Sequence, residues 1–310
     1  MTQPILVTGS HRSGTTWVGR MLSQASSLTY VYEPFSIDNP RGISNSLWYP
    51  YITAANAEQY REEMKRVIQL RPPVSSFFTE GWGLRDIVGE FQDLFKFISG
   101  RLQGRTPLLK DPIALFSTEW LVQEFGVRPV VMIRHPLAFA GSVKKLDWRF
   151  PFNDFLRQPV LMEAHLQSFE TEIRAFAEEE RDVVDQAILL WNLLYTTIET
   201  YKIQHDDWLF VRHEDIARAP IEEFSDLYNA LGLSFDEDVQ DTIRAHSARS
   251  NPVDPSNAIN TERDSKASLY TWQDRLTQEE AERVRRETAE VARSFYDADF
   301  FGERTTDGIS

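Results

Sequence analysis

Short apolar runs alternate along the chain with longer segments of mixed apolar and polar residues. Apolar runs that end in polar or turn residues lie at 4–9, 28–34, 107–112, 128–136 and 208–215. Runs of this length, bounded by Gly, Pro or charged residues, are typical of buried strands. Strands that alternate with helical segments predict an α/β fold: a three-layer sandwich with a central parallel sheet flanked by helices.

Polar side chains follow four of these predicted strands. Arg12 follows the first, Glu33 the second, Lys110 the third and Arg134 the fourth. The carboxyl ends of parallel strands meet at one edge of a sheet, and ligands bind there. We therefore expect these four side chains to converge on one site.

Two segments interrupt the alternation of strands and helices. Residues 36–106 and 147–185 are rich in aromatic residues, and we expect both to be insertions that shape an acceptor site within a single domain spanning 1–310. Their candidate lining residues are Trp48, Tyr49, Tyr51, Trp82, Trp148, Phe150 and Phe152.

The pattern also predicts individual helices. We expect one helix at 57–70, an acidic one near 162–183 and a charged one at 277–300, where Thr277 and Glu280 form a capping box. Trp191 lies in an apolar run and is expected in the core.

A glycine-rich loop follows the first predicted strand. Gly9 and Gly14 have the spacing of the phosphate-binding pattern G-x-x-x-x-G-K-[ST], but Thr15 replaces its lysine and Arg12 lies within the loop. Backbone N–H groups in such a strand–loop–helix turn bind anions. Nucleotide hydrolysis also needs that lysine and a strand-end carboxylate for magnesium. The fourth strand instead ends in Arg134. Asp111, after the third strand, is the remaining candidate for the magnesium-binding carboxylate, and it is a poor one.

Composition narrows the possible functions. The chain has no cysteine, which excludes disulfides and thiolate chemistry, and its net charge of −14 opposes general binding to nucleic acid or anionic lipid. No apolar run is long enough to span a bilayer, no leader pattern precedes the first strand, and no histidine spacing indicates a metal site. We expect a cytoplasmic, metal-independent protein without a membrane span. Nothing in the sequence indicates an oligomeric state.

Two motifs together resemble a known enzyme family. RSGTTW after the first strand and IRHPLAFAGS at the fourth resemble the sulfotransferases that use 3′-phosphoadenosine 5′-phosphosulfate (PAPS) as donor, which have a P-loop-like fold. The resemblance implies that Arg134 and Ser142 bind the 3′-phosphate. It also implies that the 5′-phosphosulfate is bound by Arg12, Ser13, Gly14, Thr15 and Thr16.

Further segments extend the resemblance. YEPF implies that Glu33 is the general base, and LLKDP implies that Lys110 lies beside the sulfuryl group, with Arg12 also stabilising charge there. FVRHEDI places His213 where the family has a tyrosine near the adenine. SLYTWQDRLT adds Lys266 and Ser268 as donor-binding candidates. Asp111 remains an alternative base.

The resemblance implies an in-line transfer of a sulfuryl group from PAPS to a hydroxyl of a carbohydrate or other small or lipid-like acceptor. Two other functions stay open. One is a degenerate P-loop kinase acting on a nucleoside or small molecule, which would need magnesium and ATP. The other is a non-catalytic nucleotide-binding regulator, which would keep the loop without its chemistry.

Overall fold

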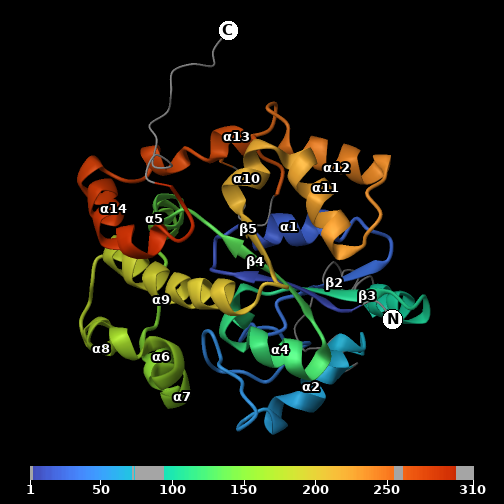
Figure 1. Ribbon diagram of the computed structural model, residues 1–310, viewed down its shortest axis with the longest axis horizontal. Helices are drawn as coiled ribbons and strands as arrows, with labels where there is room; N and C mark the ends of the chain where they lie inside the picture. Colours follow the sequence, from blue (N-terminus) through green and yellow to red (C-terminus); the bar gives the residue numbers. More distant parts are fainter. Residues whose placement is uncertain (1–2, 72, 74–93, 255–260, 298–310) are drawn as a thin grey trace, which may run out of the picture.

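A five-stranded parallel sheet forms the centre of the part of the chain that the structure describes (Figure 1). This computed structural model describes residues 3–71, 73, 94–254 and 261–297. The strands are β1 (Ile5–Gly9), β2 (Leu28–Tyr32), β3 (Thr106–Lys110), β4 (Arg128–Ile133) and β5 (Leu209–Arg212). Their order in the sheet is β2-β3-β1-β4-β5. Each apolar run predicted as a strand overlaps one, β3 beginning one residue before its run, and most of the runs continue past the strand into the loop that follows.

Helices and shorter helical turns connect the strands. They are α1 (Thr15–Leu22), α2 (Glu58–Ile68), η2 (Pro112–Ser117), α4 (Thr118–Phe125), α5 (Pro136–Lys145), α6 (Asn153–Leu156), α7 (Pro159–Leu161), η3 (Met162–Leu166), η4 (Gln167–Phe169), α8 (Glu170–Glu178), α9 (Val183–Gln204), α10 (His213–Arg218), α11 (Pro220–Leu231), α12 (Glu237–Ser247), α13 (Ser265–Ser268), η5 (Thr271–Asp274) and α14 (Gln278–Ala292). None of these described helices combines the length and apolar character that crossing a bilayer requires.

Alternate residues of β1 pack against helices on opposite faces of the sheet. Ile5 and Val7 lie in one buried cluster with Val18 of α1 and Phe224 of α11. Leu6 lies in another cluster, with Leu121 of α4. Successive side chains of a strand point to opposite faces, so α1 and α11 cover one face and α4 the other, as Figure 1 shows. The predicted three-layer α/β fold is confirmed.

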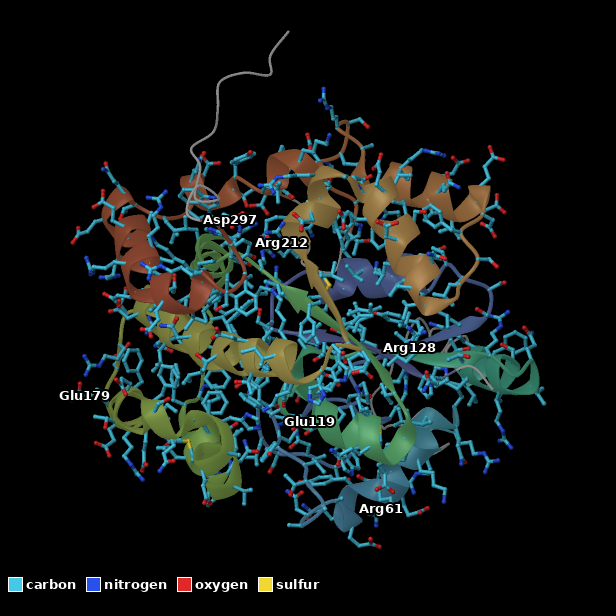
Figure 2. The ribbon with its side chains drawn as sticks, in the orientation of Figure 1. Arg61, Glu119, Arg128, Glu179, Arg212 and Asp297 are labelled. Atoms are coloured by element: carbon cyan, nitrogen blue, oxygen red, sulfur yellow. The ribbon has the colours of Figure 1, made fainter. Side chains whose placement is uncertain are left out.

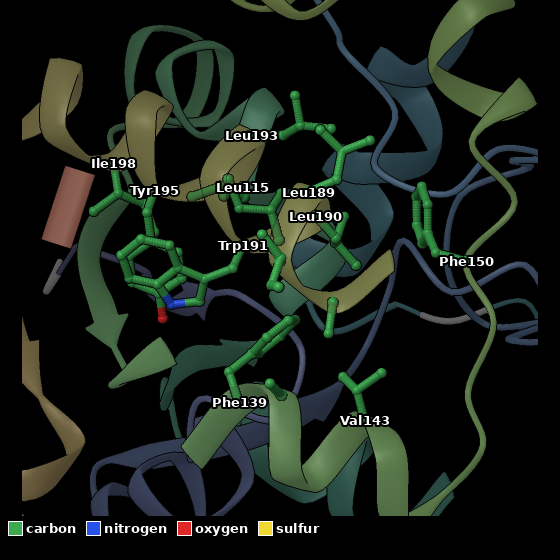
Figure 3. Packing of buried hydrophobic residues seen from close by; sticks show 14 of the residues in the cluster. Leu115, Phe139, Val143, Phe150, Leu189, Leu190, Trp191, Leu193, Tyr195 and Ile198 are labelled. Atoms are coloured by element: carbon green, nitrogen blue, oxygen red, sulfur yellow. The ribbon is translucent and has the colours of Figure 1, made fainter. Parts of the chain in front are cut away.

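The long helix α9 belongs to the core. It packs against α5 and α14, and close packing around Trp191 and Tyr195 of α9 and Phe139 and Val143 of α5 is visible in Figure 3. A helix that is apolar on nearly all sides is buried on nearly all sides. Trp191 is fully buried, so its predicted core position is confirmed.

The single acidic helix predicted near 162–183 is wrong. This segment forms a π-helical turn, η3, followed by the short η4 and then by α8, which ends at Glu178. Leu161 and Leu166 are both fully buried although they are five residues apart. An α-helix would turn these two side chains away from each other, whereas the i→i+5 bonding of a π-turn brings them to one side.

The other two helix predictions are confirmed, with shorter bounds. The helix expected at 57–70 is α2, and the one expected at 277–300 is α14. Thr277 Oγ1 accepts a hydrogen bond from the Glu280 N–H, and Glu280 accepts one from the Thr277 N–H. This is the capping box that the sequence indicated.

The amino ends of the parallel strands lie along one edge of the sheet and their carboxyl ends along the opposite one. Figure 2 labels Arg128 at the start of β4 and Arg212 at the end of β5, which mark the amino and carboxyl edges. From β1 the chain goes to β2 and β3 on one side of the sheet, and then to β4 and β5 on the other. The carboxyl ends of β1 and β4 therefore flank a reversal of strand order, the place where α/β sheets bind ligands.

Candidate active site

The loop between β1 and α1 takes a path that needs glycine at two positions. Gly9 has φ 135°, and a Cβ there would lie 2.4 Å from the Met132 carbonyl oxygen of β4. Gly14 has φ 95°, and a Cβ there would lie 2.4 Å from His213 Nδ1. Ser13 Oγ donates to the Ser10 carbonyl oxygen at 2.6 Å. The loop thus leads directly into the N-terminus of α1, whose first N–H groups have no acceptor within the helix.

The second predicted phosphate motif meets this loop. Arg12 Nε donates to Ser142 Oγ at 3.0 Å, and an Nη of Arg134 donates to the carbonyl oxygen of Arg12. Residues 12, 134 and 142 are far apart in sequence and form one group. The side chain of Arg12 belongs to this group, and its charge also lowers the pKa of Lys110. That Arg12 stabilises charge beside Lys110 stays a prediction.

A small pocket of about 60 Å³ lies beside this group. Its lining residues are Arg12, Gly14, Thr15, Thr16, Trp17, Arg134, His213, Thr261 and Arg263. Residues from four separate segments, 12–17, 134, 213 and 261–263, therefore line one space.

Sequence reasoning missed Thr261 and Arg263. It selected Lys266 and Ser268 from the same segment, but Lys266 is exposed and Ser268 Oγ donates to the Ser265 carbonyl oxygen within its own turn. The structure does not bring these two into the pocket. Arg263 lies shortly before the SLYTWQDRLT segment. An arginine so close to a predicted donor-binding segment was the signal that could have identified it.

The pocket has an excess of buried positive charge. Burial, together with neighbouring arginines, lowers the pKa of Arg134 and of Arg263 to about 10 each. Arg134 Nε and His213 Nδ1 are buried and have no hydrogen-bond partner within the described ranges. Burial also lowers the pKa of His213 well below its ordinary value, so this ring is neutral. Buried cations and unpaired donors cost free energy unless a ligand satisfies them, and an anion suits this pocket.

Glu33 and Lys110 form an ion pair at the ends of β2 and β3. The Lys110 side chain is 2% exposed and that of Glu33 is 16% exposed, while the Lys110 ammonium lies 4.3 Å from the centre of the Tyr32 ring. Burial lowers the pKa of Lys110, and the Glu33 carboxylate opposes this shift. Glu33 has φ 37°, a left-handed conformation that non-glycine residues adopt rarely and often at functional sites.

Asp111 lies next to this pair in a different environment. Its side chain is 0% exposed, and its two carboxylate oxygens accept hydrogen bonds from the N–H groups of Phe35 at 2.6 Å and Ile113 at 2.9 Å. Burial raises the pKa of Asp111 to about 7. This carboxylate fixes the turn that follows Glu33.

Aromatic residues of both predicted insertions surround His11 of the loop. The His11 ring centre lies 4.9 Å from that of Trp48 and 5.1 Å from that of Trp148. The Tyr49 hydroxyl accepts from the His11 N–H at 3.2 Å and lies 2.7 Å from His11 Nδ1. Burial lowers the pKa of His11 to about 3, so the ring is neutral. Sequence reasoning missed His11.

The other aromatic candidates have different positions. Tyr49, Phe150 and Phe152 are buried in the core, Trp82 lies outside the described residues, and Tyr51 lines a separate pocket with His165. Trp48 and Trp148 are therefore the partly buried residues of this set that lie beside the loop, and the buried Tyr49 contacts it through its hydroxyl.

Fold and site together define an α/β protein with a cluster of arginines beside the loop that follows a central parallel strand. The family model described as "Sulfotransferase family" matches residues 4–237. The chain belongs to the sulfotransferase family. This membership confirms the family and the enzyme class that the two motifs predicted. No three His, Asp or Glu side chains form a metal-binding group in the ranges that the structure describes.

Individual relatives are distant. Carbohydrate sulfotransferase 1 of Danio rerio is 34% identical over 70 residues, which are 23% of this chain and 17% of that protein. The sulfotransferase domain of the Synechococcus PCC 7002 olefin synthase is 15% identical, covers 96% of this chain and 97% of its own, and has a TM-score of 0.48. Mouse sulfotransferase SULT7A1, solved in complex with PAP, is 11% identical with coverages of 95% and 85% and a TM-score of 0.44. The family assignment depends on the match over residues 4–237.

Proposed function

We propose that this chain transfers a sulfuryl group from PAPS to a hydroxyl of a carbohydrate or other small or lipid-like acceptor. The observation that carries the proposal is the joining of two phosphate motifs through Arg12, beside a pocket with unpaired buried donors. PAPS has phosphate groups at two positions of one ribose, so its recognition requires two adjacent anion sites.

The donor-binding residues divide between these two sites. The N–H groups of residues 12–16 and the N-terminus of α1 hold the 5′ end, because they form a cradle of donors. Arg134, Ser142 and Arg12 hold the 3′-phosphate, since the planar guanidinium matches phosphate oxygens. His213 lines the same pocket as a neutral ring and contacts the nucleoside.

Lys110 and Glu33 carry out the transfer. The acceptor oxygen forms a bond to sulfur, the bond from sulfur to the 5′-phosphate oxygen breaks, and Glu33 takes the acceptor proton. Lys110, already paired with Glu33, stabilises the charge that develops on the transferring oxygens. A hydroxyl attacks poorly unless its proton is removed as the bond forms.

Glu33 suits the role of base better than Asp111 does. Both Asp111 oxygens accept backbone hydrogen bonds, and its side chain is 0% exposed. Glu33 retains an exposed fraction of 16%. A base must reach the acceptor hydroxyl, and of these two carboxylates Glu33 is the accessible one.

The acceptor binds against Trp48, Trp148 and His11. Their ring centres are 4.9 to 5.6 Å apart, so the rings already contact each other and cannot enclose an inserted aromatic ring. Their outer surfaces suit the apolar face of a saturated ring or a chain. The resemblance of the YEPF segment, rather than these rings, favours a carbohydrate or alkyl hydroxyl over a phenol.

We also propose that the protein acts in the cytoplasm and needs no metal ion. The absence of cysteine agrees with a reducing compartment such as the cytoplasm. Lys110 and the buried arginines supply positive charge at the positions where a metal-dependent phosphoryl-transfer enzyme uses magnesium, and we propose turnover without added metal.

Calorimetry with 3′-phosphoadenosine 5′-phosphate (PAP) and 5′-AMP tests the donor assignment. We expect PAP to bind about 10–100-fold more tightly, because charge-assisted hydrogen bonds to the 3′-phosphate contribute about 1.5–3 kcal/mol. Equal affinities would exclude PAPS as donor. Magnesium-dependent ATP turnover would instead support the kinase alternative.

A screen of hydroxyl acceptors with labelled PAPS tests the reaction itself. A mass gain of one sulfuryl group on a sugar or alkyl alcohol is the expected result. Tight PAP binding without transfer to any acceptor would favour the alternative of a non-catalytic nucleotide-binding regulator.

A further inference from the structure

The hydroxyl of Tyr195 contacts both halves of the candidate donor site. It accepts a hydrogen bond from the backbone N–H of Arg134 at 2.7 Å, and it lies 3.1 Å from Ser10 Oγ. Tyr195 and Ser10 are both 0% exposed. One buried oxygen atom on α9 therefore links the loop after β1 to the end of β4.

Trp191, one turn earlier on α9, holds the same residue through its other backbone polar group. Its Nε1–H donates to the Arg134 carbonyl oxygen at 3.0 Å. The Trp191 and Tyr195 rings are stacked, with centres 4.2 Å apart and planes at 11° (Figure 3). Because both polar groups of residue 134 bond to one rigid helix, the direction of its side chain is set by α9.

These contacts close a ring of hydrogen bonds around the site. Tyr195 bonds to Ser10 and Arg134, and the Arg134 guanidinium donates to the Arg12 carbonyl oxygen within the same loop. A shift of the loop would therefore stretch its bonds to Tyr195 and to Arg134 together. Packing of the buried rings alone would not link the position of the loop to that of Arg134 in this way, because hydrophobic contacts are non-directional.

We propose that Tyr195 is a positioning residue whose hydroxyl couples the two anion sites, so that the 5′-end loop and Arg134 bind the donor as one unit. The inference rests on the proposed function for the identity of the donor. The coupling itself is a property of the hydrogen bonds of the protein.

Tyr195→Phe removes the hydroxyl and keeps the stacked ring. It leaves two buried groups, the Arg134 N–H and Ser10 Oγ, without this partner. Tyr201→Phe is the matched control, because Tyr201 is also fully buried on α9 and its hydroxyl donates to the Phe116 carbonyl oxygen at 3.4 Å, away from the site.

Two measurements on these variants test the coupling. Calorimetry should show PAP affinity reduced about tenfold in Tyr195→Phe, with the preference of PAP over 5′-AMP also reduced, and both unchanged in Tyr201→Phe. Hydrogen-exchange mass spectrometry without ligand should show faster exchange in peptides covering residues 10–14 and Arg134 in Tyr195→Phe alone. Should Tyr195→Phe fail to fold, Ser10→Ala removes the other partner of the hydroxyl and should lower PAP affinity similarly.

The outcomes separate the two proposals. If the parent protein does not bind PAP, the proposed donor is wrong, and the exchange measurement alone decides the coupling. If Tyr195→Phe and Tyr201→Phe give the same exchange pattern and the same ligand preference, Tyr195 is a core residue only and the inference is overturned.

Discussion

At the scale of single residues, two carboxylates beside Lys110 have opposite environments. Glu33 retains access to solvent and pairs with the ammonium, whereas Asp111 is fully buried and accepts two backbone hydrogen bonds. Environment assigns different roles to chemically similar side chains. In the proposed reaction Glu33 takes the acceptor proton, whereas Asp111 holds the backbone that follows Glu33.

Glu33→Gln should lower kcat at least about 100-fold, because glutamine has nearly the same shape but cannot accept the acceptor proton. PAP affinity should be unchanged, since Glu33 does not line the donor pocket. Steady-state kinetics with calorimetry of PAP checks both expectations.

Asp111→Asn is the matched control for Glu33→Gln. It directs an amide nitrogen at a backbone N–H of Phe35 or Ile113, so it should lower the melting temperature more than Glu33→Gln does. Its kcat should exceed that of Glu33→Gln. The reverse order of kcat values would transfer the role of base to Asp111.

At the scale of elements, the loop after β1 depends on how closely two strands approach. Gly9 ends β1 beside Met132 of β4, where a Cβ would lie 2.4 Å from a backbone oxygen. Gly232 has φ 69° at the end of α11, with nothing within 4 Å of an added Cβ. Both residues have positive φ, but only Gly9 is also restricted by space.

Gly9→Ala should therefore destabilise the protein by more than about 2 kcal/mol, because strained backbone and overpacking both contribute. Gly232→Ala should cost only about 1–2 kcal/mol, the cost of a left-handed alanine. Urea denaturation of both variants measures the difference. Equal losses of unfolding free energy in the two variants would show that β1 and β4 move apart without cost to admit the added Cβ.

The sequence was informative wherever a local pattern determines a position. The strands, the loop at 10–16 and the residues at strand ends follow from apolar runs and glycine spacing, so Glu33, Lys110 and Arg134 could be predicted to converge. Tyr195 and Arg263 could not, because their relation to the site depends on how α9 and a distant loop pack. The π-turn at 162–166 was missed for the same reason, since burial of Leu161 and Leu166 overrides the helical pattern.

At the scale of the whole molecule, several histidines are buried as neutral rings. Burial lowers the pKa of His11 and of His135 to about 3, and that of His213 well below its ordinary value. Unfolding restores the ordinary value of 6.5, so below that pH the unfolded chain binds protons that the folded chain does not. The free energy of unfolding therefore falls as the pH drops below about 6.5.

His135→Asn tests one of these contributions. His135 Nδ1 accepts a hydrogen bond from the Leu137 N–H at the start of α5, and asparagine can cap a helix in this way. Between pH 6.5 and 5 the variant should lose about 1.4 kcal/mol less per pH unit than the parent, the value for one proton. Urea denaturation across this range measures the slopes.

The comparison with the parent cancels other titrating groups. Asp111 and Glu214 have pKa values raised by burial, so they bind protons in the folded state and act in the opposite direction. Identical slopes for the two proteins would mean that His135 becomes charged without unfolding.

The central position of β1 has a consequence for how the chain emerges during synthesis. The neighbours of β1 in the sheet are β3 and β4, which end at Lys110 and Ile133, about 100 and 120 residues later. At the usual rate of roughly 5–20 residues per second, translation of this interval takes roughly 6–25 s. Until β3 has been made, after roughly 5–20 s, the nascent chain carries an apolar strand with both edges open, a substrate for chaperones. The loop after Gly9 reaches its final path only once β4 has left the ribosome.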